Sequence, residues 1–300
     1  MDLRIVGSCN GLLCLNDVNW NYLYLLNPAT KEYKRLTYPT YDVCFTWSIF
    51  GFGYNPKTDE YKVVMISYYR IEQSIHGDVY VYTLGTNPSW RSIGPMECYI
   101  GYPGHALING AIHWMASDTA GFTMVLISFD FRDEKFRELS LPEIFRQKGI
   151  KYHLKLVELG GFLSLYCHKD ERNFEIWVMK NYGDEHSWTK VFSVAHPDLS
   201  QFWGSFRPLV ILKKDEVLCG SDFELFIIDV VKNKIQILHS GEWYDSGIEM
   251  YFESLVSLRA DGGTDLGKQE RREREGERLA LEATNACQKA FVTNRVFFGI

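Results

Sequence analysis

Residues 10–15 read Asn-Gly-Leu-Leu-Cys-Leu, a tight turn followed by an apolar strand, and this unit returns further along the chain. Residues 109–114 (Asn-Gly-Ala-Ile-His-Trp) and 160–165 (Gly-Gly-Phe-Leu-Ser-Leu) repeat it, and residues 215–219 (Asp-Glu-Val-Leu-Cys) form a weaker copy. The step from residue 109 to residue 160 is 51 residues, and the step from residue 10 to residue 109 is 99, about twice as long. The chain therefore repeats a turn-and-strand unit at a nearly fixed interval.

Two further markers share this interval. Asp130 and Asp229 follow similar aliphatic strands 99 residues apart, and the pairs Ser89-Trp90 and Ser187-Trp188 lie 98 residues apart. A repeat of about 50 residues with four short strands is typical of a kelch-like β-propeller blade. We predict a propeller of five to six blades, with five at about residues 5–38, 49–94, 104–142, 154–195 and 207–240, and residues 251–258 as a candidate strand for a sixth. The alternative is a β-sandwich, or a pair of them, with coincidental spacing.

The composition supports an all-β fold class. The 300 residues are 46% hydrophobic and 23% charged, as in a folded globular protein, and 15% aromatic, which favours strands. Helical periodicity is nearly absent, apart from a possible turn at residues 142–147. The net charge is −6 and no basic stripe appears before residue 260, so we expect no nucleic-acid partner.

The cysteines and the amino-terminal residues predict an intracellular protein, cytoplasmic or nuclear. The seven cysteines are scattered without a C-x-x-C pair, which predicts reduced and mostly buried thiols. Met1 to Ile5 runs straight into a strand-like pattern, without the long apolar centre of a signal peptide. We expect no membrane partner.

The composition changes abruptly after residue 258. The segment 259–300 alternates acids and bases, and pairs such as Glu270/Arg274 would support a solvated helix. No apolar heptad seam persists, so a partner helix is the less favoured interpretation. The predicted domains are therefore a propeller at 1–258 and a charged, helical or disordered tail at 259–300.

No local motif predicts catalysis, and the sequence assigns no catalytic, cofactor-binding or metal-binding residue. Gly51-Phe52-Gly53 is not followed by a third glycine and predicts a glycine-kinked strand. His113 alternates with apolar neighbours and predicts a satisfied structural histidine rather than a ligand. Adjacent carboxylates predict solvated turn residues; they are Asp59-Glu60, Asp133-Glu134 and Asp215-Glu216. The Ser-Trp pairs predict packing between blades.

Surface recognition is the remaining function. Four long, aromatic-rich segments are candidates for partner-binding loops: Tyr38 to Trp47, Tyr68 to Gly77, Cys98 to Gly104 and Ala195 to Phe206. The alternative is that their aromatic side chains fold back onto the propeller. The substrate-binding residues stay unknown at this stage.

A series of ordered motifs resembles a known family. They are Val6 to Leu15, Leu26 to Lys31, Phe50 to Val64, Leu107 to Trp114, Ile127 to Asp130, Glu175 to Met179 and Ser187 to Lys190. Together they are similar to the plant F-box-associated interaction domain, a kelch-related propeller, over about residues 5–258. No F-box-like segment precedes residue 5, and the segment after Arg259 does not match the family pattern.

The resemblance implies a role without catalysis. In such proteins an F-box docks on the Skp-type adaptor of a cullin–RING ubiquitin ligase, and the propeller presents a target protein for ubiquitin transfer. The implied partners are target proteins, and the adaptor where an F-box is present upstream; no cofactor is implied. One alternative is a propeller that binds targets without recruiting the ligase. The other is a propeller hydrolase or oxidase.

Overall fold

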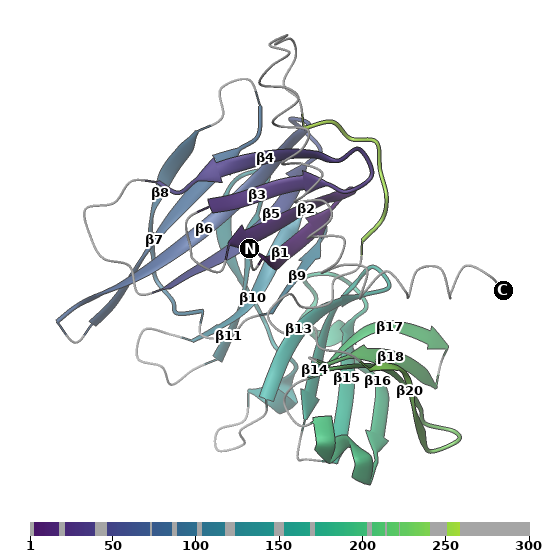
Figure 1. Ribbon diagram of the computed structural model, residues 1–300. Coiled ribbons are helices and arrows are strands. Elements are labelled where there is room, and N and C mark those ends of the chain that lie inside the picture. The colour runs from purple at the N-terminus through teal and green to yellow at the C-terminus, as the bar shows by residue number, and fades with distance from the viewer. Residues whose placement is uncertain are drawn as a thin grey trace.

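The computed structural model describes residues 3–17, 22–39, 47–72, 74–85, 89–100, 104–117, 124–146, 153–168, 172–202, 206–213, 215–221, 223–240 and 251–258. They fold into five antiparallel sheets of four consecutive strands each, the five blades of a β-propeller (Figure 1). The predicted fold class and the five predicted blades are confirmed.

The blades follow one another along the chain. Blade 1 contains β1 (Leu3–Cys9), β2 (Leu12–Asp17), β3 (Tyr22–Asn27) and β4 (Glu32–Thr37). Blade 2 contains β5 (Trp47–Asn55), β6 (Glu60–Ile71), β7 (Ser74–Thr83) and β8 (Trp90–Met96). Blade 3 contains β9 (His105–Ile108), β10 (Ala111–Ser117), β11 (Met124–Asp130) and β12 (Lys135–Leu139). Blade 4 contains β13 (His153–Leu159), β14 (Phe162–His168), β15 (Asn173–Met179) and β16 (Trp188–Ala195). Blade 5 contains β17 (Arg207–Lys213), β18 (Glu216–Gly220), β19 (Glu224–Asp229) and β20 (Lys234–Ser240).

The helical content of the described residues is confined to three short 3₁₀ helices. They are η1 (Glu143–Phe145), η2 (Glu185–Ser187) and η3 (Pro197–Phe202). The first of them confirms the helical turn expected at residues 142–147. The charged segment 259–300 lies outside the described residues.

The spacing of Asp130 and Asp229 reflects a turn that four blades share. An Asn or Asp at the end of a strand accepts a hydrogen bond from a backbone N–H two or three residues ahead, and the fourth residue after it has a positive φ. The four pairs are Asn27/Lys31, Asn55/Asp59, Asp130/Glu134 and Asp229/Asn233. This Asx turn reverses the chain within a few residues, so it fixes the register of each hairpin.

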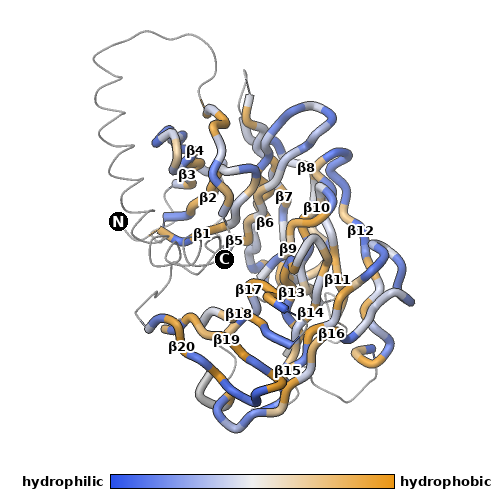
Figure 2. Tube along the Cα trace, turned by 90° about the vertical axis from the view of Figure 1, so that its right-hand side faces the viewer, coloured by the Kyte–Doolittle hydropathy of each residue, from blue (hydrophilic) through white to orange (hydrophobic). Residues whose placement is uncertain are grey.

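Neighbouring blades bury apolar side chains against each other. One shared cluster joins blades 1 and 2, and others join blades 2 and 3, 3 and 4, and 4 and 5. Figure 2 shows apolar stretches along the strands and polar ones at many of the turns. Each sheet has two faces to bury. The stacking of neighbouring blades therefore explains why apolar side chains lie on both faces of the strands.

Blade 3 packs closely on the first strand of blade 2 because that strand carries two glycines. A Cβ at Gly53 would lie 2.2 Å from Phe131 Cε2, and a Cβ at Gly51 would lie 2.7 Å from Ile112 Cδ1. The strand β5 pairs with β6 in unbroken register through both glycines. The two glycines therefore make room for side chains of blade 3, whereas the sequence predicted a glycine-kinked strand.

Residues 251–258 form no strand, so this candidate adds no sixth blade and the described propeller has five. They run beside blade 1 as an extended segment, drawn in yellow-green in Figure 1, which we call the strap. Tyr251 is buried in a cluster with the outer face of blade 1, and Leu258 is buried in the cluster between blades 1 and 2.

Polar contacts hold the middle of the strap. The Asn27 side-chain amide donates to the carbonyl oxygens of Ser254 (3.0 Å) and Val256 (2.7 Å). Ser254 Oγ donates to the Asn10 carbonyl oxygen at 2.8 Å, and the Leu258 N–H donates to Glu32 Oε2 at 2.7 Å. The strap thus crosses the turns of blade 1 and fixes residues 251–258 to the first blade.

Candidate functional site

The two faces of the propeller differ in their connections. Antiparallel strands reverse direction, so the turns between first and second strands and between third and fourth strands lie at one end of each blade, the turn face. The connections between second and third strands, and those joining successive blades, lie at the opposite end, the loop face. All four candidate loops of the sequence begin and end at the loop face, although residues 40–46, 73, 101–103 and 203–205 lie outside the described residues.

Three aromatic residues of these loops pack against the propeller. Trp47 stacks on Tyr68 with ring centroids 5.3 Å apart, and Tyr99 meets both rings edge-on at 5.5 Å. The Tyr68 hydroxyl donates to the Cys98 carbonyl oxygen at 3.1 Å and accepts from the Ile100 N–H at 3.0 Å. Burial raises the pKa of Tyr68, which stays a neutral donor. For these residues, the interpretation that the aromatics fold back is the correct one.

The connection from blade 4 to blade 5 also turns inward. Leu199 and Phe206 are buried in the cluster between those blades. His196 Nδ1 accepts from the Asp198 N–H at 3.1 Å, so the other ring nitrogen carries the proton and donates to the Asn233 carbonyl oxygen at 3.2 Å. This histidine therefore has a structural role.

Other apolar side chains of the loop face remain exposed. They are Ile71 (51% exposed), Ile75 (40%), Met124 (37%) and Phe223 (44%). Ile71 and Ile75 lie near the tip of the β6–β7 hairpin. Met124 is the first residue of β11, the third strand of blade 3, and Phe223 lies between the second and third strands of blade 5. Exposed apolar residues next to aromatic ones are typical of protein interfaces.

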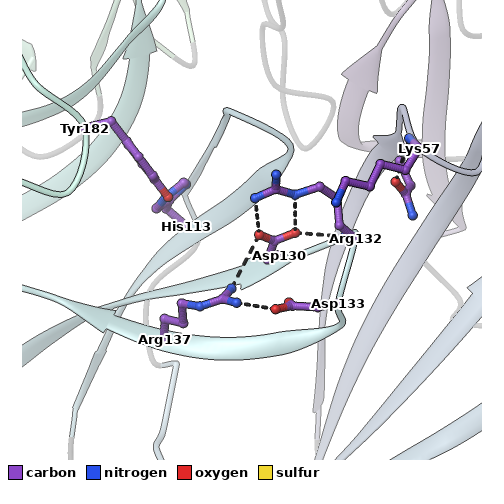
Figure 3. A network of polar contacts seen from close by, with 8 residues as sticks. Lys57, His113, Asp130, Arg132, Asp133, Arg137 and Tyr182 are labelled. Carbon is purple, nitrogen blue, oxygen red and sulfur yellow. Dashed lines mark hydrogen bonds and ion pairs between the residues drawn. The ribbon is translucent and has the colours of Figure 1, made fainter.

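His113 is a structural histidine, as the sequence predicts. Its Nδ1 lies 3.0 Å from the Ala106 carbonyl oxygen, which can only accept, so Nδ1 carries the proton. Its Nε2 then accepts from the Tyr182 hydroxyl at 2.8 Å (Figure 3). Tyr182 comes from the turn before η2, so this contact links blades 3 and 4. Burial lowers the pKa of His113 to about 4.

The lowered pKa predicts an acid-sensitive fold. The unfolded chain binds a proton at His113 near pH 6.5, whereas the folded chain binds it only near pH 4. The free energy of unfolding should therefore fall as the pH drops through this window, by about 2 kcal/mol between pH 7 and pH 5. Urea unfolding of wild type and His113→Gln at both pH values measures the difference. His186→Asn is the control because His186 is exposed; equal pH slopes for wild type and His113→Gln would contradict the prediction.

A network of charged side chains occupies the blade 3 turn near Lys57 of the β5–β6 turn (Figure 3). Arg132 Nη2 contacts Asp130 Oδ2 at 2.8 Å, and Arg137 contacts both Asp130 and Asp133. The hydrogen bond from Arg132 holds the pKa of Asp130 below its ordinary value. Two carboxylates thus face two guanidinium groups, and the network stabilises its own hairpin.

The neighbouring residue corrects one prediction. The side chain of Glu134 is only 13% exposed, and it contacts Lys62 of blade 2 at 2.8 Å and also Arg91 of that blade. Glu134 is therefore an ion-pair link between blades rather than a solvated turn residue. Asp59 is an exposed turn residue, as predicted, and accepts from the Tyr54 hydroxyl at 2.6 Å.

The two Ser-Trp pairs pack between blades, which confirms their prediction. The Trp90 Nε1–H of blade 2 donates to the Thr37 carbonyl oxygen at the end of blade 1, at 2.7 Å. The Trp188 Nε1–H of blade 4 donates to the Ser140 carbonyl oxygen just after the last strand of blade 3, at 3.0 Å. The same contact at two junctions explains the spacing of 98 residues.

Five cysteines fall among the described residues, and all are free thiols. Burial raises the pKa of Cys9 to about 12 and that of Cys98 to about 11, so both are protonated at neutral pH. Cys44 and Cys287 lie outside the described residues. The described residues contain no group of three or more His, Cys, Asp or Glu side chains placed to hold a metal ion. None of their helices is long and apolar enough to cross a membrane.

Sequence reasoning missed the strap and the link through Glu134. The Asn-Pro turn at residues 27–28 is visible in the sequence, but its partner residues lie more than 220 positions away. An Asn at residue 27 and an Asn at residue 55 look alike locally, although only the first has described contacts with the strap. Residues 251–258 read Tyr-Phe-Glu-Ser-Leu-Val-Ser-Leu, and no local pattern in them separates a strap from the strand that the sequence analysis considered.

Comparison with known proteins gives relatives of one kind. A family model described as the F-box associated beta propeller domain matches residues 1–258. F-box protein At3g07870 of Arabidopsis thaliana is 32% identical over 216 residues, covering 65% of this chain and 51% of the relative. F-box/kelch-repeat protein At3g23880 is 31% identical over 69% of this chain and 56% of its own length, and F-box protein CPR1 is 28% identical over 84% and 68%, both from the same plant. The chain thus spans about half the length of the first two.

Solved structures are more distant. A prolyl endopeptidase aligns with a TM-score of 0.44 and 12% identity, over 80% of this chain and 37% of its own. The Trypanosoma rangeli sialidase aligns with a TM-score of 0.42 and 11% identity, over 80% and 48%. The family assignment rests instead on the match over residues 1–258, and this chain belongs to the F-box-associated β-propeller family.

Proposed function

We propose that this chain is a protein-recognition module that holds a target protein at its loop face for ubiquitin transfer within an SCF-type ligase. Its relatives named F-box proteins and its family membership support this role. The observation that carries the choice of face is the exposure of Ile71, Ile75, Met124 and Phe223 there, beside connections that vary in length. The chain would contribute proximity and orientation, and the chemistry would occur on partner enzymes.

The choice of face is tested by matched substitutions. We expect the double variant Met124→Ser, Phe223→Ser to lower the recovery of co-purifying target proteins from plant tissue by about tenfold. Apolar residues that become buried on binding contribute most of the binding energy of an interface. The control is Phe162→Ser with Val231→Ser, two exposed apolar residues of the turn face. Quantitative mass spectrometry after crosslinking measures the recovery. An equal loss for both double variants, or a loss only for the control, would assign recognition elsewhere.

A separate measurement addresses the ligase. Co-purification of the chain with a Skp-type adaptor, and ubiquitination of the captured target in the reconstituted complex, would support the ligase role. Target capture without the adaptor would favour the alternative of a propeller that binds targets without recruiting the ligase.

A further inference from the structure

The β6–β7 hairpin extends beyond the rest of its sheet. The last pairing of β5 with β6 joins Trp47 to Tyr68, and the last pairing of β7 with β8 joins Gly77 to Met96. Beyond these pairs, β6 and β7 continue as a two-stranded ribbon, residues 69–72 and 74–76, which projects from blade 2 at the loop face (Figure 1). Its residues 70–72 and 74–76 are exposed.

The register shows where the backbone groups of the ribbon point. Ile71 pairs with Ser74 across a two-residue loop, so they are the hydrogen-bonded pair that closes the hairpin. The next pair, Arg70 with Ile75, is then a non-hydrogen-bonded pair, and the N–H and C=O of Ile75 point away from β6. Pro95, which has no N–H, lies opposite Asp78, where the same alternation requires no donor toward β7. The alternation of backbone groups that point toward β6 and away from it is therefore the same along the whole of β7.

The strand β8 cannot cover the outer edge of the ribbon. After Met96 the chain turns toward blade 3, where Tyr99 pairs with Ser117. The Tyr68 hydroxyl holds this departing segment through Cys98 and Ile100. The line of β8 is thus left open beside Ile75, and no described residue pairs with that edge.

The open edge lacks the features that usually protect one. Residues 74–76 (Ser-Ile-His) contain no lysine, proline or bulge, and Ile75 is an exposed β-branched residue. Ile75 shares a sheet face with Tyr68, whose ring belongs to the aromatic cluster with Trp47 and Tyr99. The edge therefore combines unpaired backbone groups with an apolar side chain.

Charge defines the partner further. Among the described residues, Glu72, Asp78 and Glu97 carry carboxylates at and just below the ribbon, against the guanidinium of Arg70. An extended segment with an apolar residue opposite Ile75 and a basic residue beside it would complement this edge.

We propose that the β7 edge of the ribbon takes up an extended, basic–apolar segment of the target protein as an added strand, in the line left open by β8. This inference rests on the proposed function and specifies its binding mode. The target backbone exchanges hydrogen bonds with the N–H and C=O of Ile75, and its apolar side chain lies beside Ile75 on the face shared with Tyr68.

Selection from a displayed library of random ten-residue peptides against the full chain tests the proposal. We expect the enriched peptides to alternate β-branched or aromatic residues with Lys or Arg, and the Ile75 amide to exchange more slowly in their presence. Ile75→Pro removes the outward N–H without removing a bond of the ribbon, and should weaken binding of a selected synthetic peptide about tenfold or more. Ile75→Thr retains the N–H and should change the affinity by less than about threefold.

The second variant changes the selected peptide and not the protein, so it cannot affect folding of the protein. An ester in place of the amide that faces Ile75 removes one backbone donor, and should weaken binding about fivefold or more. Equal binding of the amide and ester forms, equal binding to wild type and Ile75→Pro, or no enrichment of extended peptides would overturn the proposal. Loss of target capture by the Met124/Phe223 variant alongside any of these results would leave recognition at the loop face standing, with another element as the binding strand.

Discussion

Replacement of Gly53 by alanine is expected to destabilise the propeller by about 3 kcal/mol or more, because overpacking a tight interface forces side chains off their rotamers. The new Cβ would lie 2.2 Å from Phe131 Cε2. Phe131 is fully buried and packs edge-on against Phe129 at 5.4 Å, so its ring has little room to withdraw. The φ of Gly53 is not positive, so alanine meets no backbone strain there and the loss of stability comes from packing alone. Thermal and urea unfolding measure the loss.

Two variants separate this packing effect from a general cost of alanine in place of glycine. Gly85→Ala should leave stability nearly unchanged, since no atom of the described residues beyond its chain neighbours lies within 4 Å of its new Cβ, and its φ is not positive. Gly53→Ala combined with Phe131→Leu should recover part of the loss, because the smaller side chain makes room and the two residues couple. Equal stability of the Gly53→Ala and Gly85→Ala proteins would show that blade 3 does not need the bare backbone of β5.

Replacement of Asn27 by aspartate is expected to destabilise the protein by about 3 kcal/mol, since it removes two buried donors and places a carboxylate against two carbonyl oxygens. Aspartate still accepts from the Ala29 and Thr30 N–H groups, so the turn itself is retained. What is lost is the pair of bonds to Ser254 and Val256. Denaturant unfolding gives the free energy, and hydrogen exchange of residues 251–258 reports whether the strap is released.

The matched control is Asn55→Asp. Asn55 occupies the same turn in blade 2, is almost as buried, and accepts from the Lys57 N–H at 3.0 Å. Asp130 and Asp229 occupy this position in blades 3 and 5, so aspartate suits the turn. We expect a loss of about 1 kcal/mol or less and unchanged exchange in the strap. A loss at Asn55 as large as that at Asn27 would show that burial of the carboxylate, and not the strap, decides the effect.

The blades could be predicted from the sequence because their determinants are local and repeated. The turn at Asn10-Gly11, the Asx turns at Asp130 and Asp229, and the tryptophans at 90 and 188 each recur with the blade. The Asx turns recur with a positive φ at their fourth residue, and the two tryptophans make the same contact with the preceding blade. Residues that recur at a fixed interval in the sequence therefore occupy equivalent positions in the blades.

The details of the loop face could not be predicted, because large apolar or aromatic residues of one segment are buried at one position and exposed at another. Tyr68 and Ile75 both lie in one predicted loop, yet the first is buried under Tyr99 and the second is exposed. Their difference depends on where β8 ends and the chain crosses to blade 3, which no short pattern encodes. Glu134 escaped prediction for a similar reason, since its partners Lys62 and Arg91 come from another blade.

Because the strap packs on blade 1, the first blade is completed only after residues 251–258 have been synthesised. Asn27 and Val256 are 229 residues apart in sequence, so at ordinary translation rates roughly ten to fifty seconds separate the appearance of the two outside the ribosome. During that interval the nascent first sheet exposes Leu13, Leu15 and Tyr24 without the ring of Tyr251 that later covers them. The earliest sheet to be made is thus the last to be finished.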